Sequence, residues 1–239
     1  MAENQNSGSA IEKWQKFKAE GRPFAEHLLN IIKAGLSAAP FAGAIASLMT
    51  DYIPAARSQR LEEFAEQIAD DLRRLQDRVI VEYLKTDEFA FMFEKCFRAV
   101  AENPQQEKLE AFRGILVNSA IRKDLSGEEK EFFLNLAMNL STLHIRILRF
   151  MATPEEFLNA AGIPQANIQG GFSHFFPVAL PGVKLDVIRS AFGDLYRYGL
   201  ISTDQSIFGT MTAGQGLQLL KGRVTELGQN FIGFCSVTK

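Results

Sequence analysis

The residue types that most often carry chemistry are few in this chain and lie far apart along it. The three histidines are His27, His144 and His174, and the two cysteines are Cys96 and Cys235. None of them stands at the short spacing of a zinc-binding motif. We therefore expect no metal site, and we interpret His144, which lies in an apolar helical stretch, as a packing or capping residue.

Motifs that bind nucleotides or activate a nucleophile are also missing from the sequence. It contains no Walker loop, no GxGxxG and no GxSxG. The glycines of Gly214-Gln-Gly216 are typical of a turn. The sequence thus predicts a protein that is not an enzyme and that uses no cofactor.

Basic residues near the C-terminal end offer a different chemistry, the binding of DNA. The residues that could contact phosphates or bases are Lys184, Arg189, Arg197, Lys221 and Arg223. The first three lie on a predicted helix over 184–197, which also carries Asp186 and Asp194 and has no Asn or Gln to read adenine. We favour contact with a protein, or self-association, and keep DNA as the alternative.

The composition is that of a soluble globular protein without a strong charge. Of 239 residues, 46% are hydrophobic and 23% charged, with a net charge of −2. Residues 1–140 carry 18 Lys and Arg against 22 Asp and Glu, and residues 141–239 carry 8 against 6. The small basic excess of the second part has the sign for DNA but not the size. The first ten residues are polar, which predicts a disordered tail over 1–10, no signal peptide and a cytoplasmic location.

Residues 11–140 predict a helical bundle domain. A helix is expected over 57–84, because apolar residues recur there at alternating spacings of four and three: Leu61, Ala65, Ile68, Leu72, Leu75 and Val79. This is either a long bundle helix with a charged outer face or one strand of a parallel coiled-coil dimer. Ser126 and Glu129 predict a capping box that begins a helix through Leu140.

Residues 34–50 form a stretch without a charge, rich in alanine and interrupted by Pro40. As a helix this stretch would span about 25 Å, less than the roughly 30 Å of a membrane core. It fits a buried bundle helix, but Phe41 and Ile45 could contact a membrane, and an oligomer contact is the third alternative.

Residues 141–239 resemble the winged-helix superfamily. The resemblance rests on the helical pattern over 185–195, on Tyr198-Gly-Leu-Ile-Ser202 and on the Thr-x-x-Gly of Thr225 to Gly228. It implies helices over 142–151, from Thr153 onwards and over 184–197, followed by wing strands over 200–203 and 217–224. The fold class is therefore mainly α, a helical bundle with a C-terminal winged-helix (α+β) domain.

An inserted loop at about 163–182 separates the second and third of these helices. It carries Phe172, Phe175 and Phe176, which are too apolar for a solvated loop. The insert is either an arm that contacts a partner or a lid that folds back over its own domain.

A weaker pattern over residues 39–61 and 107–119 is similar to uncharacterised bacterial helical proteins, some of them associated with abortive infection against phage. Together these patterns predict a non-enzymatic bacterial interaction or regulatory protein with a link to phage defence. A transcriptional regulator is the first alternative, and a membrane-active effector acting through residues 34–50 is the second.

Overall fold

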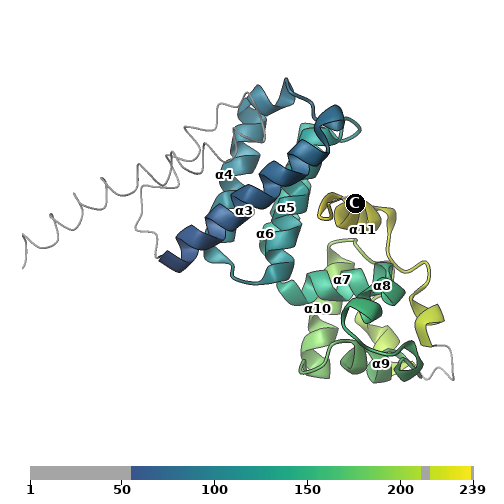
Figure 1. Ribbon diagram of the computed structural model, residues 1–239. Coiled ribbons are helices and arrows are strands. Elements are labelled where there is room, and N and C mark those ends of the chain that lie inside the picture. The colour runs from purple at the N-terminus through teal and green to yellow at the C-terminus, as the bar shows by residue number, and fades with distance from the viewer. Residues whose placement is uncertain (1–54, 211–215, 238–239) are drawn as a thin grey trace, which may run out of the picture. The chain divides into compact units, whose positions relative to one another are not determined.

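The computed structural model describes residues 55–210 and 216–237, and these residues are mainly helical (Figure 1). The chain divides into two compact units, Met1–Leu134 and Asn135–Lys239, and the division falls inside helix α6 (Gly127–Asn139) rather than after residue 140. The expected tail over 1–10 and the uncharged stretch with Phe41 and Ile45 lie outside the described residues.

The described part of the first unit is built on three mutually packed helices. These are α3 (Ala55–Arg74), α4 (Asp87–Glu102) and α5 (Gln106–Ile121). Phe93 and Phe97 of α4 stack with ring centroids 4.2 Å apart, and Phe64 of α3 meets Phe97 edge-on at 5.1 Å. Aromatic burial of this kind supplies much of the stabilisation of a small helical core.

The long helix expected over 57–84 is shorter than its apolar repeat indicates. It ends at Arg74, and the chain continues through two 3-10 helices, Gln76–Arg78 and Tyr83–Lys85. Between them Val79 is extended and the backbone N–H of Ile80 donates to the carbonyl of Ala120 in α5 at 2.8 Å. This tertiary hydrogen bond favours an extended chain at this point, and the β-branched residues Val79-Ile-Val81 have a low helix propensity. The helix therefore does not continue through this segment.

Local side-chain hydrogen bonds fix where the helices of this unit begin. The capping box at α6 is confirmed, since Ser126 N–H donates to Glu129 at 2.8 Å and Glu129 N–H donates to the Ser126 hydroxyl at 3.2 Å. Helix α4 begins at Asp87. Its cap is Thr86, whose hydroxyl accepts from Phe89 N–H at 3.2 Å.

The second unit packs its helices around α7 and α10. Helix α7 (Thr142–Ala152) contacts α8 (Pro154–Ala160), α10 (Leu185–Arg197) and α11 (Glu226–Phe234), and α9 (Phe172–Ala179) packs on α10. Pro154 at the first position of α8 needs no hydrogen-bond acceptor, which explains the sharp restart of the chain there.

The expected wing strands are not found among the described residues of this unit. Ile201 and Val224 form a single antiparallel bridge, and 3-10 helices over Gln205–Gly209 and Gly216–Leu220 occupy the chain between them. Leu219 and Leu220 turn into the core from the second 3-10 helix. The prediction of a strand over 217–224 was therefore wrong, because burial of these two leucines sets the local conformation.

Candidate functional site

The exposed face of α10 presents the first two of the predicted DNA-contacting cations to solvent. Lys184 precedes the helix and Arg189 lies on its outer surface, and both are exposed. Asp186 and Ser190 share this outer surface. The face is thus polar and accessible, but it mixes charges of both signs.

The two cations predicted on the wing have different environments. Lys221 is exposed, whereas Arg223 is half-buried and bound within its own unit. The Arg223 guanidinium donates to the carbonyl of Leu219 and, at 2.7 Å, to the hydroxyl of Thr203. Its Cζ also lies 5.6 Å from the ring centroid of Phe172. Arg223 therefore stabilises the segment around the bridge and is not presented to a ligand.

The segment over 163–182 is folded rather than a loop. It contains a 3-10 helix, Gln165–Asn167, and helix α9, from which Phe172, Phe175 and Phe176 enter the core at no more than 1% exposure. Their rings pack edge-on against Phe150, Phe192 and Phe208. In this arrangement the three phenylalanines are not available to a partner, and the segment covers its own unit as the lid alternative describes.

A hydrogen-bonded relay connects the start of α7 to the end of α10. His144 Nδ1 accepts from Ser141 N–H at 3.1 Å and lies 2.7 Å from the Ser141 hydroxyl, and His144 Nε2 lies 3.2 Å from Asp194 Oδ2. Because Nδ1 accepts, the ring proton is on Nε2, where it is donated to Asp194. Asp194 Oδ1 accepts in turn from the guanidinium of Arg197. The capping role expected for His144 is thus confirmed.

Asp194 is the central acceptor of this relay. Partial burial acts to raise the pKa of its carboxyl, but the hydrogen bonds from His144 and Arg197 outweigh burial, and the net result is a lowered pKa. The carboxylate is therefore ionised and holds both donors in position. Sequence reasoning missed this relay, because its two halves are fifty residues apart.

Apolar side chains are also exposed on and beside α10. Val187, Tyr196 and Tyr198 are exposed by 51%, 45% and 43%. Tyr198 and Arg197 border a hollow of about 360 Å³, which Asn139, Leu140, His144 and Asp194 also line. Tyrosine and arginine are the residue types enriched at the energetic centres of protein interfaces.

A larger hollow lies on another part of the same unit. It has a volume of about 760 Å³ and is bordered by polar side chains, among them Asn167, Gln169 and His174, but by no Asp, Glu, Lys or Arg. The backbone of Gly170 and Gly171 and the side chains of Val178 and Phe208 also line it. It has the size of a small-molecule site, but no charged group in it specifies a ligand.

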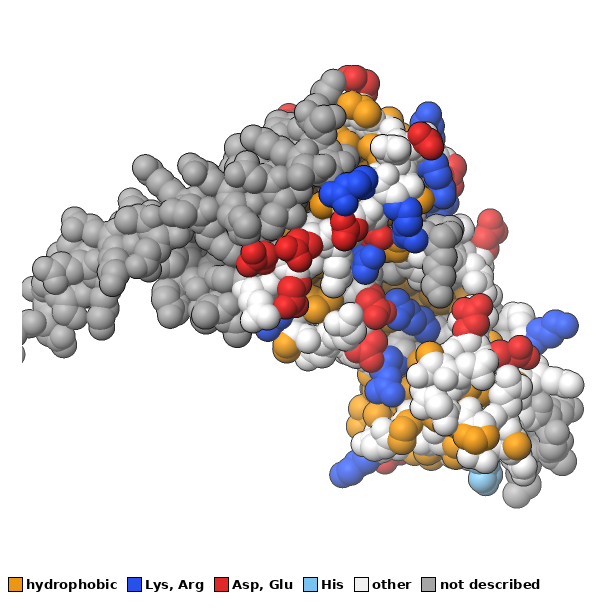
Figure 2. All heavy atoms as spheres, viewed as in Figure 1, with side chains coloured by type: hydrophobic (Ala, Val, Ile, Leu, Met, Phe, Trp, Pro, Cys, Tyr) orange, Lys and Arg blue, Asp and Glu red, His pale blue; other side chains and the backbone are white. Residues whose placement is uncertain are grey.

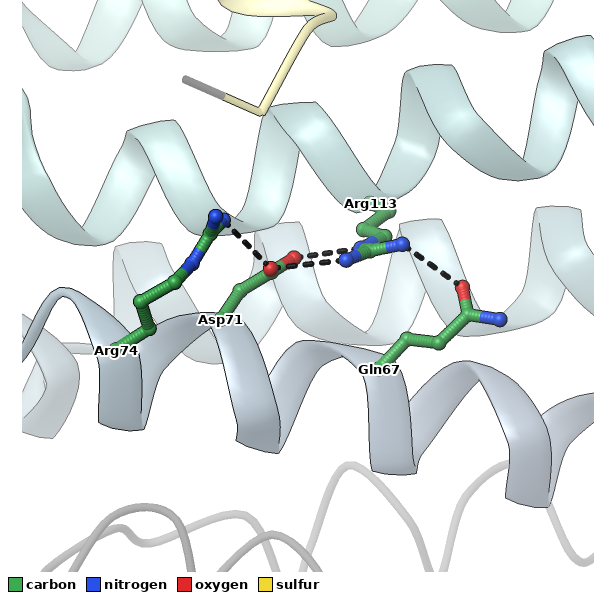
Figure 3. Close-up of polar contacts among 4 residues, drawn as sticks. All are labelled: Gln67, Asp71, Arg74 and Arg113. Carbon is green, nitrogen blue, oxygen red and sulfur yellow. Dashed lines mark hydrogen bonds and ion pairs between the residues drawn. The ribbon is translucent and has the colours of Figure 1, made fainter. Parts of the chain in front are cut away.

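Two polar clusters of the first unit have structural rather than chemical roles. In Figure 3, Arg113 of α5 donates two hydrogen bonds of 2.5 and 2.8 Å to Asp71 of α3. Arg74 also donates to Asp71, and Arg113 donates a further hydrogen bond to Gln67. The hydrogen bond to Asp71 raises the pKa of Arg113, against the effect of burial. This side-chain cluster joins α3 to α5, because a buried carboxylate requires paired donors.

The second cluster places a buried lysine on an aromatic ring. Lys130 Nζ lies 3.8 Å from the ring centroid of Tyr83, whose hydroxyl donates to Glu88 at 2.6 Å. Burial lowers the pKa of Lys130, and burial together with the Glu88 hydrogen bond raises the pKa of Tyr83. The cluster fixes the start of α6 against the segment that follows α3.

No group of His, Cys, Asp and Glu in the described part of the chain could hold a metal ion. Likewise, no described helix is long and apolar enough to cross a membrane. On the face shown in Figure 2, acidic and basic side chains are interspersed, without a broad field of one sign. Comparison with family models, curated proteins and solved structures found no match for this chain.

Proposed function

We propose that this chain is a non-enzymatic interaction protein, and that its second unit is a winged-helix-like module which binds a protein through the exposed face of α10. The observation that carries the proposal is the exposure of Tyr196 and Tyr198 beside Arg197 at the C-terminal end of α10. A lone exposed apolar residue is ordinary, but two exposed tyrosines next to an exposed arginine favour an interaction site.

The order of elements supports the winged-helix part of this proposal. Helices α7, α8 and α10 follow the order of the three helices of a winged helix, and the Ile201–Val224 bridge stands where the wing would begin. The described residues after α10 form no extended hairpin of the kind that many DNA-binding relatives lay along the phosphate backbone. With Arg223 bound internally, protein contact is favoured over DNA.

The biological setting that we propose is bacterial, with a link to phage defence. It rests on the weak sequence similarity over residues 39–61 and 107–119, and most of the first of these stretches lies outside the described residues. A regulatory role in such a system needs recognition of a partner but no catalysis, which agrees with the interaction surface on α10.

Site-specific photo-crosslinking in the cells that produce the protein tests this function. A photoreactive phenylalanine analogue at Tyr196 should give a crosslinked species of discrete mass. The same analogue at Phe132, which is 46% exposed on α6 in the first unit, is the matched control. Adding Tyr198→Asp should remove the product, because a charge in an apolar contact is costly. Equal products from both positions, or none from Tyr196, would refute the proposal.

DNA binding is the second candidate, and the exposure of Lys184, Arg189 and Lys221 is what favours it. Fluorescence anisotropy with genomic fragments at about 50 mM salt tests it, since low salt strengthens even non-specific association. If DNA is bound, Arg189→Ala weakens the signal and Arg223→Ala does so only by unfolding the protein. No signal from the wild type at this salt concentration removes the candidate.

A further inference from the structure

The Arg197 guanidinium has more N–H donors than its hydrogen bond to Asp194 uses. A guanidinium has five N–H donors, and the one bond found for this group among the described residues goes to Asp194. The Arg197 side chain is nevertheless 76% exposed, so its remaining donors face solvent. An exposed arginine without such a tether would sample many rotamers and lose that freedom on binding.

The relay behind Arg197 provides the tether. Ser141 holds His144, His144 holds Asp194, and Asp194 holds Arg197, in bonds that run from the α7 cap to the last residue of α10. Both oxygens of Asp194 accept hydrogen bonds, so the carboxylate orients the guanidinium and does not need a further cation. Such pre-organisation lowers the entropic cost of binding.

The residues around Arg197 indicate which chemical group could bind to its guanidinium. The hollow of about 360 Å³ has one apolar wall from Leu140 and an aromatic edge from Tyr198. The Asp194 carboxylate in the same hollow repels a doubly charged phosphate more strongly than a singly charged carboxylate, because the repulsion grows with the charge of the ligand. A single carboxylate with an apolar stem satisfies both conditions.

We infer that this hollow, here called the Arg197 pocket, receives an aspartate or glutamate side chain of a protein partner. The carboxylate accepts from the free N–H groups of Arg197, and the neighbouring residues of the partner pack on Tyr198 and Tyr196. This inference rests on the proposed protein-binding function and names the chemistry of that partner, an acidic segment with apolar neighbours.

Peptide titration of the purified full chain tests the pocket directly. The probe is acetyl-Leu-Glu-Phe-Glu-Leu-amide, compared with the same peptide carrying Gln in place of both Glu, and binding is followed by amide chemical shifts. We expect the Glu peptide to shift the signals of Ser141, His144 and residues 194–198, and the Gln peptide to bind roughly tenfold or more weakly, as for loss of a charged hydrogen bond.

Three variants make this test specific. Arg197→Gln should abolish the difference between the two peptides, and Lys123→Gln, which removes an exposed cation of the first unit, should keep it. His144→Ala retains Arg197 but removes its tether, so an intermediate affinity is expected with an unchanged preference for Glu. Equal binding of both peptides by the wild type, or an Arg197→Gln variant that binds like the wild type, overturns the inference, provided that each variant keeps the wild-type melting temperature.

Photo-crosslinking separates a failure of this inference from a failure of the proposed function. One informative result is a crosslink from Tyr196 to a protein whose bound segment has no Asp or Glu, and another is a yield that Arg197→Gln leaves unchanged. Either result supports the proposed function and refutes the binding of a carboxylate in the Arg197 pocket. If no protein is crosslinked, the proposed function fails and the peptide titration alone decides the pocket. Duplex DNA that shifts the same signals in an Arg197-dependent way would assign the pocket to phosphate and overturn the inference.

Discussion

The backbone of Gly228 in α11 lies directly against the carbonyl oxygen of Leu200, so that a Cβ at Gly228 would stand 2.2 Å from that oxygen. Thr225 creates this approach. Its hydroxyl donates to Gly199 O at 2.7 Å and accepts from Gly228 N–H at 3.0 Å, and its own N–H donates to Leu200 O at 3.1 Å. The Thr-x-x-Gly motif is thus the joint between α11 and the chain after α10.

Gly228→Ala should destabilise the second unit, because neither Leu200 O nor Val224 Cγ1, 2.8 Å from the added carbon, can move aside without cost. Overpacking of this kind costs roughly 1–3 kcal/mol. Gly233→Ala is the matched control on the same helix, where a Cβ would meet nothing within 4 Å. There we expect a gain of about 0.5–1 kcal/mol from helix propensity. Urea unfolding measures both, and a neutral Gly228→Ala would contradict the close approach.

Asp71→Ala should weaken the bundle of the first unit. It removes a carboxylate that is only 4% exposed and leaves Arg113 without its main acceptor. Breaking a buried pair costs roughly 3–5 kcal/mol, and we expect about 2–3 kcal/mol here because Arg113 is partly solvated. Asp70→Ala, which removes an exposed pair with Arg73, should cost less than about 1 kcal/mol. Similar melting temperatures of the two variants would show that the cluster adds nothing.

Arg223→Ala should act on stability and not on the binding of a ligand. The side chain bonds to Leu219 O and Thr203 and packs on Phe172, so its loss leaves acceptors unpaired and a ring uncovered. We expect a cost of about 1–3 kcal/mol, against roughly 0.5 kcal/mol or less for the exposed Lys221→Ala. Differential scanning calorimetry compares them. An Arg223→Ala variant as stable as Lys221→Ala would show that the internal contacts of Arg223 do not stabilise the protein.

Asp124 should give the protein a small acid-dependent loss of stability. The hydrogen bond from Arg122 lowers its pKa to about 2 from an ordinary 3.8. A carboxyl whose pKa is depressed by folding stabilises the protein above its unfolded pKa, and this contribution is lost as the pH falls toward the folded value. Asp124 is mostly exposed, so the effect should stay below about 1 kcal/mol.

Chemical denaturation of the wild type and Asp124→Asn between pH 6 and about pH 2 checks this expectation. The two should differ most above the ordinary pKa of 3.8 and converge toward about pH 2. Arg122→Gln, which removes the donor, should show the same convergence as Asp124→Asn. A difference that persists unchanged to the acid end would assign the effect to packing and not to ionisation.

Much of the local structure could be predicted from neighbouring residues alone. The Ser126–Glu129 capping box is made by residues three apart, and the proline after Thr153 begins α8, because a cap needs only the geometry of one helical turn. The capping role of His144 belongs to the same class, since its partner Ser141 is three residues away. The Thr225 to Gly228 motif marked the start of α11 for the same reason.

The remaining features depend on residues far apart in sequence, which no local pattern encodes. The apolar repeat continued past Arg74, but a hydrogen bond from Ile80 to Ala120 diverted the chain. Phe172, Phe175 and Phe176 could equally form an exposed arm or a covered core, and only packing against Phe150 and Phe192 decided between them. Composition and periodicity thus determined that the chain is helical and without a catalytic motif. The tertiary structure decided which charges are free, because a side chain such as Arg223 is engaged only when a distant acceptor, here Thr203, reaches it.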